Sequence, residues 1–383
     1  MSRTCIALNR IATMFMLSAS LLVPLPAAGV STLTVLHSFT SGADGFAPVA
    51  PVLFGPGGKL FGTTLNTVFE IDPATGILTT LHTFLDSPDG AFPDSGLVRS
   101  RKGVLYGTTL AGGANGFGTI YKINPKTQAL TILHNFTGTD GSGPVTELLL
   151  GLDGLFYGTT LGGGPKGNNG TIFVFNPLTN ILTTLRALQS SDGTNPSAGL
   201  VQDAQGAFYG VAGSGGKHGK GTLFKITQSG TKPVFRKLHD FTGGPDGDGP
   251  GGTLVIDSAG VLYGTTSSGG PRKDGTVFSY SPALQTIKSL HIFRGPDGIN
   301  PSAGLTLGNG VLYGVTTFGG GSTSGTAFKL DIATKALTTL WNFSGGPSGG
   351  LPQARMVLKG GFLYGTTFDG GSFFSGVVFQ LTP

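Results

Sequence analysis

Cysteine is almost absent from this sequence, since Cys5 is the only one among 383 residues. It lies in an N-terminal segment with the parts of a secretory signal: the positive residues Arg3 and Arg10, an apolar stretch over residues 11–23, and small residues near position 29. We therefore predict a signal peptide over residues 1–29. The mature chain then holds no disulfide, thiol nucleophile or thiolate metal ligand. Export without disulfides favours a bacterial periplasm, cell surface or extracellular location.

Charged residues are scarce too, at 11% of the chain, and the formal net charge of +5 falls to +3 once Arg3 and Arg10 are removed. No run of basic residues is present, which argues against nucleic acid as a partner. We expect no transmembrane segment in the mature chain, because no apolar run of sufficient length follows the signal.

Residues typical of several enzyme classes are also few. Glutamate occurs only as Glu70 and Glu147, and the sole tryptophan is Trp341. Glycoside hydrolysis needs paired acids, and propellers that use quinone cofactors dock them with several tryptophans. No P-loop motif is present. From these absences we expect no cofactor and no metal, and we assign no catalytic residue.

Glycine, in contrast, is abundant, and its 68 residues without a G-X-Y period indicate many turns between short strands. A motif of an apolar residue, an aromatic residue and glycine recurs at intervals of 45 to 54 residues. Its seven copies are residues 60–62, 105–107, 156–158, 208–210, 262–264, 312–314 and 363–365. A period of this size predicts a β-propeller, a single body over residues 30–383.

Each copy divides into four short strands. In the second copy they are residues 96–98, 104–109, 119–123 and 130–136, which are rich in β-branched, leucine and aromatic residues and bounded by turn formers. We therefore predict an all-β fold, a seven-bladed β-propeller of four-stranded antiparallel blades. We expect each motif aromatic to pack between blades, so Tyr263→Ala should destabilise the fold rather than remove an activity.

The two ends of the chain predict how the ring closes. Residues 34–39 match the fourth strand of a blade, whereas residues 376–381 match the third. Pairing of the N-terminal and C-terminal strands would therefore complete the last blade. Such pairing removes two free sheet edges that otherwise invite aggregation.

The repeat resembles the GloVer tandem repeat of bacterial exported proteins, whose pattern is Leu-Tyr-Gly-Thr-Thr, a Gly-Gly loop and Gly-Thr-Val-Phe. The fifth copy has it at residues 262–266, 269–270 and 275–278, and recognisable copies cover most of residues 34–383. The resemblance implies an exported repeat protein but carries no general activity. Members often have anchoring tails, whereas no such tail precedes Pro383, so we expect an unanchored form.

Two loops of each repeat are expected on one face of the propeller, the connection between blades and the Gly-Gly loop. The connection carries Asp-Gly followed by proline in six copies, with the aspartates Asp44, Asp89, Asp140, Asp192, Asp246 and Asp297. Six carboxylates on one face are candidates for binding a divalent cation or sugar hydroxyls. The alternative is that each aspartate only forms its turn. The first copy lacks the Gly-Gly loop, which predicts a notch there.

Histidine recurs in five of the seven repeats in a Leu-His-x-Phe pattern, which places these side chains on the outermost strands and too far apart to share a metal. The series comprises His37, His82, His134, His239 and His291, with Arg186 and Trp341 at this position in the other copies. Only His218 lies outside this pattern, in a candidate face loop. It is a candidate binding residue or general base, and the alternative is a solvated loop position.

Three functional hypotheses follow. The first is an exported, monomeric binding module that uses its glycine-rich loop face for an unidentified ligand, either carbohydrate or protein. The second is a secreted propeller hydrolase or lyase acting on polysaccharide, in which His218 and an aspartate of the face are the catalytic candidates. The third is a structural protein of the cell envelope.

Overall fold

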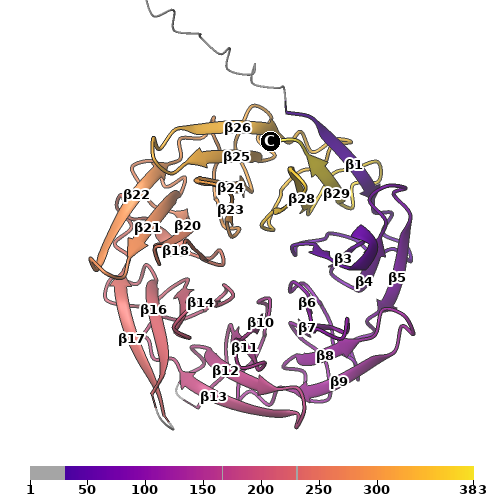
Figure 1. Cartoon of the computed structure of the whole chain (residues 1–383), viewed down its shortest axis with the longest axis horizontal. Helices are drawn as coiled ribbons and strands as arrows, with labels where there is room; N and C mark the ends of the chain where they lie inside the picture. The colour runs from indigo at the N-terminus through magenta and orange to yellow at the C-terminus, as the bar shows by residue number, and fades with distance from the viewer. Residues whose placement is uncertain (1–30, 166, 230–231) are drawn as a thin grey trace, which may run out of the picture. The chain divides into compact units, whose positions relative to one another are not determined.

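The computed structural model describes residues 31–165, 167–229 and 232–383. The predicted signal peptide lies outside these residues, and the domain boundary at residue 29 stays a prediction. In the described part of the chain, antiparallel strands form seven sheets around a central axis (Figure 1). The one helical element there is a short 3-10 turn, η1 (Pro56–Gly58). The predicted seven-bladed β-propeller is confirmed.

Within each blade the strands run in order from the axis outward. They are β2 (Leu53–Phe54), β3 (Leu60–Thr63), β4 (Thr67–Ile71) and β5 (Leu78–Thr83) in blade 1; β6 (Val98–Arg99), β7 (Leu105–Thr109), β8 (Thr119–Ile123) and β9 (Leu130–Asn135) in blade 2; β10 (Leu149–Leu150), β11 (Phe156–Thr160), β12 (Thr171–Asn176) and β13 (Ile181–Ala187) in blade 3; and β14 (Val201–Gln202), β15 (Phe208–Ala212), β16 (Thr222–Ser229) and β17 (Lys232–Asp240) in blade 4.

The remaining three blades follow the same order. They are β18 (Asp248–Pro250) and β19 (Val255–Ile256), which both pair with β20 (Leu262–Ser268), then β21 (Thr276–Ser281) and β22 (Thr286–Ile292) in blade 5; β23 (Thr306–Leu307), β24 (Val311–Thr316), β25 (Thr326–Asp331) and β26 (Leu337–Asn342) in blade 6; and β27 (Val357–Lys359), β28 (Phe362–Thr367), β29 (Val377–Leu381) and β1 (Leu33–Ser38) in blade 7.

Closure of the ring occurs in blade 7, where the two ends of the described chain meet. Strand β1 pairs antiparallel with β29, from Leu33 opposite Leu381 to Ser38 opposite Val377. The backbone N–H of Phe39 then donates to the carbonyl of Gly376 at 3.0 Å. The predicted pairing of N-terminal and C-terminal strands is confirmed.

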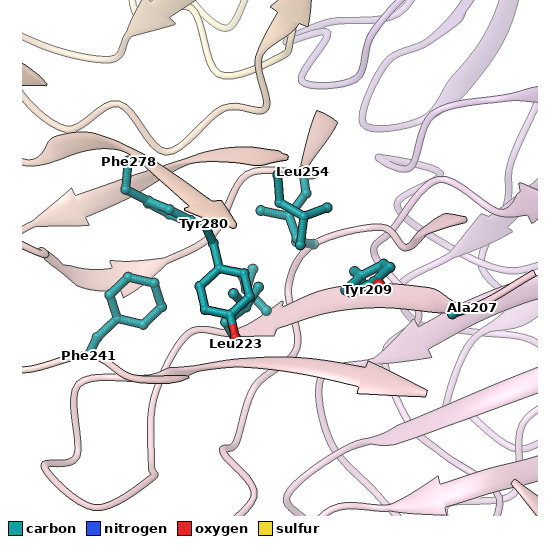
Figure 2. Packing of buried hydrophobic residues seen from close by; sticks show 10 residues of the cluster. Ala207, Tyr209, Leu223, Phe241, Leu254, Phe278 and Tyr280 are labelled. Carbon is teal, nitrogen blue, oxygen red and sulfur yellow. The ribbon is translucent and has the colours of Figure 1, made fainter. Parts of the chain in front are cut away.

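The core is divided into seven apolar clusters, each formed by two neighbouring blades. In the cluster between blades 4 and 5, Tyr209 and Phe241 come from blade 4, and Leu254, Phe278 and Tyr280 from blade 5 (Figure 2). The motif aromatic Tyr263 is 5% exposed and belongs to the cluster between blades 5 and 6. This placement agrees with the expectation that these rings pack between blades.

The two loops expected on one face lie against each other. Isolated bridges join the blade connection to the Gly-Gly loop, as between Ala91 and Ala111 and between Thr194 and Ser214. In blade 1 only residues 64–66 link β3 to β4, as the missing Gly-Gly loop predicts. We call this side the loop face, and the opposite side, with the turns between the first and second and between the third and fourth strands, the hairpin face.

Candidate functional site in the axial channel

A pocket of about 270 Å³ lies on the axis, where the chain enters the innermost strands from the loop face. Every blade contributes to it through the short segment that follows the connection proline. The lining residues fall within segments 49–51, 94–96, 145–147, 197–199, 251–253, 302–304 and 353–355. The pocket is therefore built from equivalent positions of all seven repeats.

These segments place variable positions of the repeat at the axis. In each copy a proline is followed by a lining residue, a small or buried residue, a second lining residue and a large apolar residue. The first lining positions are Val49, Asp94, Val145, Ser197, Gly251, Ser302 and Gln353, and the second are Pro51, Gly96, Glu147, Gly199, Thr253, Gly304 and Arg355. The scaffold residues repeat, whereas the channel residues differ.

An ion pair crosses the channel. The guanidinium of Arg355, in blade 7, donates to Glu147 Oε2, in blade 3, at 2.8 Å. The two blades are not neighbours in the ring, so the pair spans the axis. The Glu147 side chain also packs against Gly96, where a Cβ atom would lie 3.2 Å from Glu147 Cβ. With 23% and 29% of their side chains exposed, Glu147 and Arg355 remain accessible from the pocket.

Asp94 is the third charged residue of the pocket. Among the described residues, its Oδ1 atom is one of four buried side-chain polar atoms with no hydrogen-bond partner. Burial raises the pKa of this carboxyl from 3.8 to about 6. An orphaned buried acceptor is costly unless water or a ligand donates to it. Asp94 lines the axial pocket, so a carboxyl group with an unpaired oxygen lies in the wall of the channel.

A second departure from the repeat occurs in the same blade. Tyr121 occupies a position held by phenylalanine in the other six blades, and its hydroxyl is another of the buried groups without a partner among the described residues. Burial, and then the charge of Asp94, raise the pKa of Tyr121 above its ordinary value. Blade 2 therefore combines two unusual polar groups that influence each other, and the other blades have neither.

Beyond the ion pair the channel becomes apolar. A second pocket of about 360 Å³ shares Glu147 and Arg355 with the first. The innermost strands supply its other walls, among them Leu149, Val201 and Val255. The ion pair hence separates a polar compartment at the loop face from an apolar one.

The six aspartates predicted as binding residues lie elsewhere, one on each of six blade connections. Each carboxylate contacts the basic residue of the preceding outermost strand. The pairs are His37–Asp44 at 3.0 Å, His82–Asp89 at 2.7 Å, His134–Asp140 at 2.9 Å, Arg186–Asp192 at 2.6 Å, His239–Asp246 at 3.0 Å and His291–Asp297 at 2.8 Å. The structure does not bring these aspartates together, and ligand binding by them stays a prediction.

Asp246 shows what such a carboxylate does in its turn. It accepts hydrogen bonds from the hydroxyl and backbone N–H of Thr242 as well as contacting His239. Burial alone would raise the pKa of Asp246, but these hydrogen bonds outweigh burial and the pKa is lowered from 3.8. Over residues 31–165, 167–229 and 232–383, no group of three or more His, Cys, Asp or Glu residues is placed to hold a metal ion.

We predict that Asp246→Asn lowers the free energy of unfolding at pH 7 by about 1–2 kcal/mol, because the charged acceptor is lost. The folded-state pKa of Asp246 is depressed, so its contribution is present above the ordinary pKa of 3.8 and disappears as pH falls through the folded value. Denaturant unfolding at pH 7 and at about pH 2, well below the ordinary pKa, measures the difference. An equal loss at both pH values would contradict the charge-based explanation.

His218 lies in the loop between β15 and β16 and is exposed. It does not line the axial pocket. Its neighbour Lys220 forms an ion pair with Asp248 at 2.7 Å. The structure therefore places His218 in neither the channel nor a cluster of candidate site residues, and its role in binding stays a prediction.

Sequence reasoning missed the channel residues. In the sequence Glu147 is only an acid near a strand, and no motif gives Asp94 or Arg355 a role. A usable signal is present, because aligning the copies on the connection proline isolates the positions that vary.

The pairing of the connection aspartates with the outermost strands also has a signal in the sequence. The basic residue and aspartate recur six or seven residues apart, and the seventh copy replaces both together, with Trp341 and Ser348. Replacement of both residues in the same copy indicates that the basic residue and the aspartate contact each other.

Comparisons with known proteins agree with the architecture. The model of the Gloeobacter/Verrucomicrobia repeat matches residues 25–149, 65–269 and 251–383. No curated protein matches the sequence. In the described residues, no helix has the length and apolar character needed to cross a membrane.

Solved structures share the fold at low identity. The extracellular domain of a candidate hybrid two-component system from B. thetaiotaomicron is 12% identical, with a TM-score of 0.55, and the match covers 88% of this chain and 40% of that one. A candidate 6-phosphogluconolactonase from Bacteroides uniformis is 14% identical, with a TM-score of 0.50 and coverage of 78% and 83%. These likenesses concern the fold alone. The repeat matches extend over nearly the whole sequence, and the chain belongs to the Gloeobacter/Verrucomicrobia repeat family.

Proposed function

We propose that this protein is an exported binding module that holds a small polar ligand in the axial pocket, on the loop face of the propeller. The observation that carries the proposal is the convergence of variable repeat positions at the axis, where they supply Asp94, Glu147 and Arg355. A purely structural ring has no need of charges there, because burying them costs free energy.

The pocket chemistry favours a neutral polyol such as a sugar. Its volume of about 270 Å³ suits one or two sugar rings rather than a polymer held along its length. Asp94 offers an acceptor, Arg355 offers donors, and Ser197, Thr253 and Gln353 offer both. A ring of hydroxyl groups, each a donor and an acceptor, matches this mixture better than an apolar ligand does.

We predict that Asp94→Asn weakens ligand binding at least about tenfold, because a hydrogen bond to a charged acceptor is lost.

The same substitution should stabilise the ligand-free protein at pH 7. The folded-state pKa of Asp94 is raised from 3.8 to about 6, so wild-type stability falls as pH rises through this window. Above it, the variant should be more stable by about 1–3 kcal/mol. Thermal unfolding at pH 4 and 7, with and without ligand, measures both effects.

The ligand is sought by thermal shift of the mature protein against neutral monosaccharides and disaccharides and against divalent cations. Asp246→Asn is the matched control, because it removes the same charge from one of the predicted loop aspartates. Loss of binding in Asp94→Asn alone supports the axial site. Loss of binding only in Asp246→Asn would indicate that the ligand binds at the loop aspartates and not in the axial pocket. If no compound stabilises the wild-type protein, the small-ligand proposal is contradicted.

A second candidate function is hydrolysis or elimination on a saccharide, and the raised pKa of Asp94 is the observation that favours it. A carboxyl with a pKa of about 6 is suited to general acid–base catalysis near neutral pH. Any ligand found in the screen should therefore be incubated with the protein and its products analysed. Turnover that Asp94→Asn abolishes across the pH range would support an enzyme. Binding without turnover would support the binding module instead.

A further inference from the structure

A further pocket, separate from the two in the axial channel, lies on the hairpin face between blades 1 and 2 and has a volume of about 640 Å³. Five cationic residues line it, Lys59, Arg99, Arg101, Lys102 and Lys126, and the only acidic lining residue is Glu70. They come from the turns between the first and second strands of both blades, from β4 and β6, and from the turn after β8. The axial pocket shares none of these residues.

The positive charge of the protein is concentrated here. Residues 31–383 carry a formal charge of +3, since Arg3 and Arg10 lie outside them. The pocket lining carries +4, so the rest of this region is close to neutral. Glu70 forms an ion pair with Lys59 and neutralises only that lysine. Four cationic side chains with no charged partner on the pocket wall then face one cavity.

The corresponding turn of blade 4 shows that the fold does not require this charge. There, Gln202, Asp203, Ala204 and Gln205 stand where blade 2 has Arg99, Ser100, Arg101 and Lys102. Asp203 accepts a hydrogen bond from the Tyr209 hydroxyl at 3.0 Å, and in blade 5 Asp257 accepts one from Tyr263 at 2.9 Å. Blade 2 has Ser100 instead of this acid. Compared with the turn of blade 4, the turn of blade 2 lacks this acid and has three additional cations.

We propose that this pocket binds an acidic oligosaccharide, a chain of sugar units carrying carboxylates. Arginine forks bind carboxylates in a bidentate manner, and several cations spaced along a cavity suit several carboxylates on one ligand. Asn124 adds a neutral amide for hydroxyl groups, and the rings of Pro56 and Pro125 offer apolar surface for the faces of sugar rings. A cavity of this size accommodates a short oligomer.

The test compares binding of oligogalacturonate, a neutral oligosaccharide of equal length and inorganic phosphate by isothermal titration calorimetry. The variant Arg99→Gln, Arg101→Ala, Lys102→Gln gives three of the four positions of this turn the residues of blade 4 and keeps Ser100, so the fold should tolerate it. We expect it to weaken oligogalacturonate binding at least about tenfold, with a smaller salt dependence than wild type. The control Lys217→Gln, Arg272→Gln, Lys335→Asn removes equal charge from exposed positions elsewhere and should bind like wild type.

Several outcomes would overturn the proposal. Wild type that does not bind oligogalacturonate, or an Arg99→Gln, Arg101→Ala, Lys102→Gln variant that binds it as tightly as wild type, excludes an acidic-saccharide site in this pocket. An equal loss of affinity for the neutral oligosaccharide in that variant excludes it too, because neutral sugars bound in the axial pocket would not be affected. An equal loss in the control variant indicates attraction by net charge rather than by this pocket. Phosphate that binds as tightly as the oligomer indicates a simple anion site. The residues that line this pocket are not those that line the axial pocket. The outcome of this titration therefore does not depend on whether Asp94 binds a ligand.

Discussion

Phe39→Ala is expected to lower the free energy of unfolding by about 3–5 kcal/mol, the usual cost of removing a fully buried phenylalanine. Phe39 is 0% exposed and follows β1, the strand that completes blade 7. Its ring packs edge-on against Phe69 of blade 1 with centroids 5.3 Å apart, in a cluster that also holds Tyr364 and Val378 of blade 7. The side chain therefore joins the first and last blades at the point of closure.

Phe241→Ala is the matched control for this closure prediction. Phe241 occupies the equivalent position after β17, is also 0% exposed and packs against Phe278 of the next blade at 5.2 Å. Its blade is continuous in sequence, whereas β1 is held to β29 only by strand pairing and packing. We expect similar losses in denaturant unfolding, but faster hydrogen exchange of β29 amides only in Phe39→Ala. Equal exchange in both variants would show that closure is not a weak point.

The fold was predictable because the residues that build it recur in every copy. Tyr263 and Gly264 have counterparts in the other six blades, and their neighbours alternate as strands require. A boundary that differs is that of the innermost strand, expected at residues 96–98 but observed in blade 2 as Val98–Arg99. Gly96 lines the axial pocket instead of pairing, because the chain turns into the channel before the strand begins.

The candidate site was not predictable in the same way, because its residues are the exceptions to the repeat. Glu147 and Arg355 are 208 positions apart, and only closure of seven blades around one axis brings them together. Asp94 and Tyr121 each look unremarkable in a single copy and become informative only when the copies are aligned. The aspartates of the blade connections, in contrast, recur for a structural reason. Each accepts hydrogen bonds within its own turn and from the basic residue of the preceding strand.

Gly264→Val is expected to destabilise the protein by about 3 kcal/mol or more, because the space beside this glycine is already filled. A Cβ atom at this position would lie 2.6 Å from Cζ of Phe278 on the adjacent strand and 2.7 Å from Cδ2 of Leu254. All seven motif glycines meet such a ring, at 2.4 to 2.6 Å from its nearest atom. The recurring glycine thus makes room for the recurring aromatic residue of the third strand.

The steric origin of this effect is tested by adding a compensating change. Gly264→Ala alone should cost about 1–3 kcal/mol, and combining it with Phe278→Leu should cost less than the sum of the two single changes, because the shorter side chain vacates the space. Gly321→Ala is the control, since its Cβ would meet nothing closer than 3.9 Å. Denaturant unfolding of the four variants gives the coupling free energy. Strict additivity would contradict the packing explanation, and the glycine would then be required for its backbone instead.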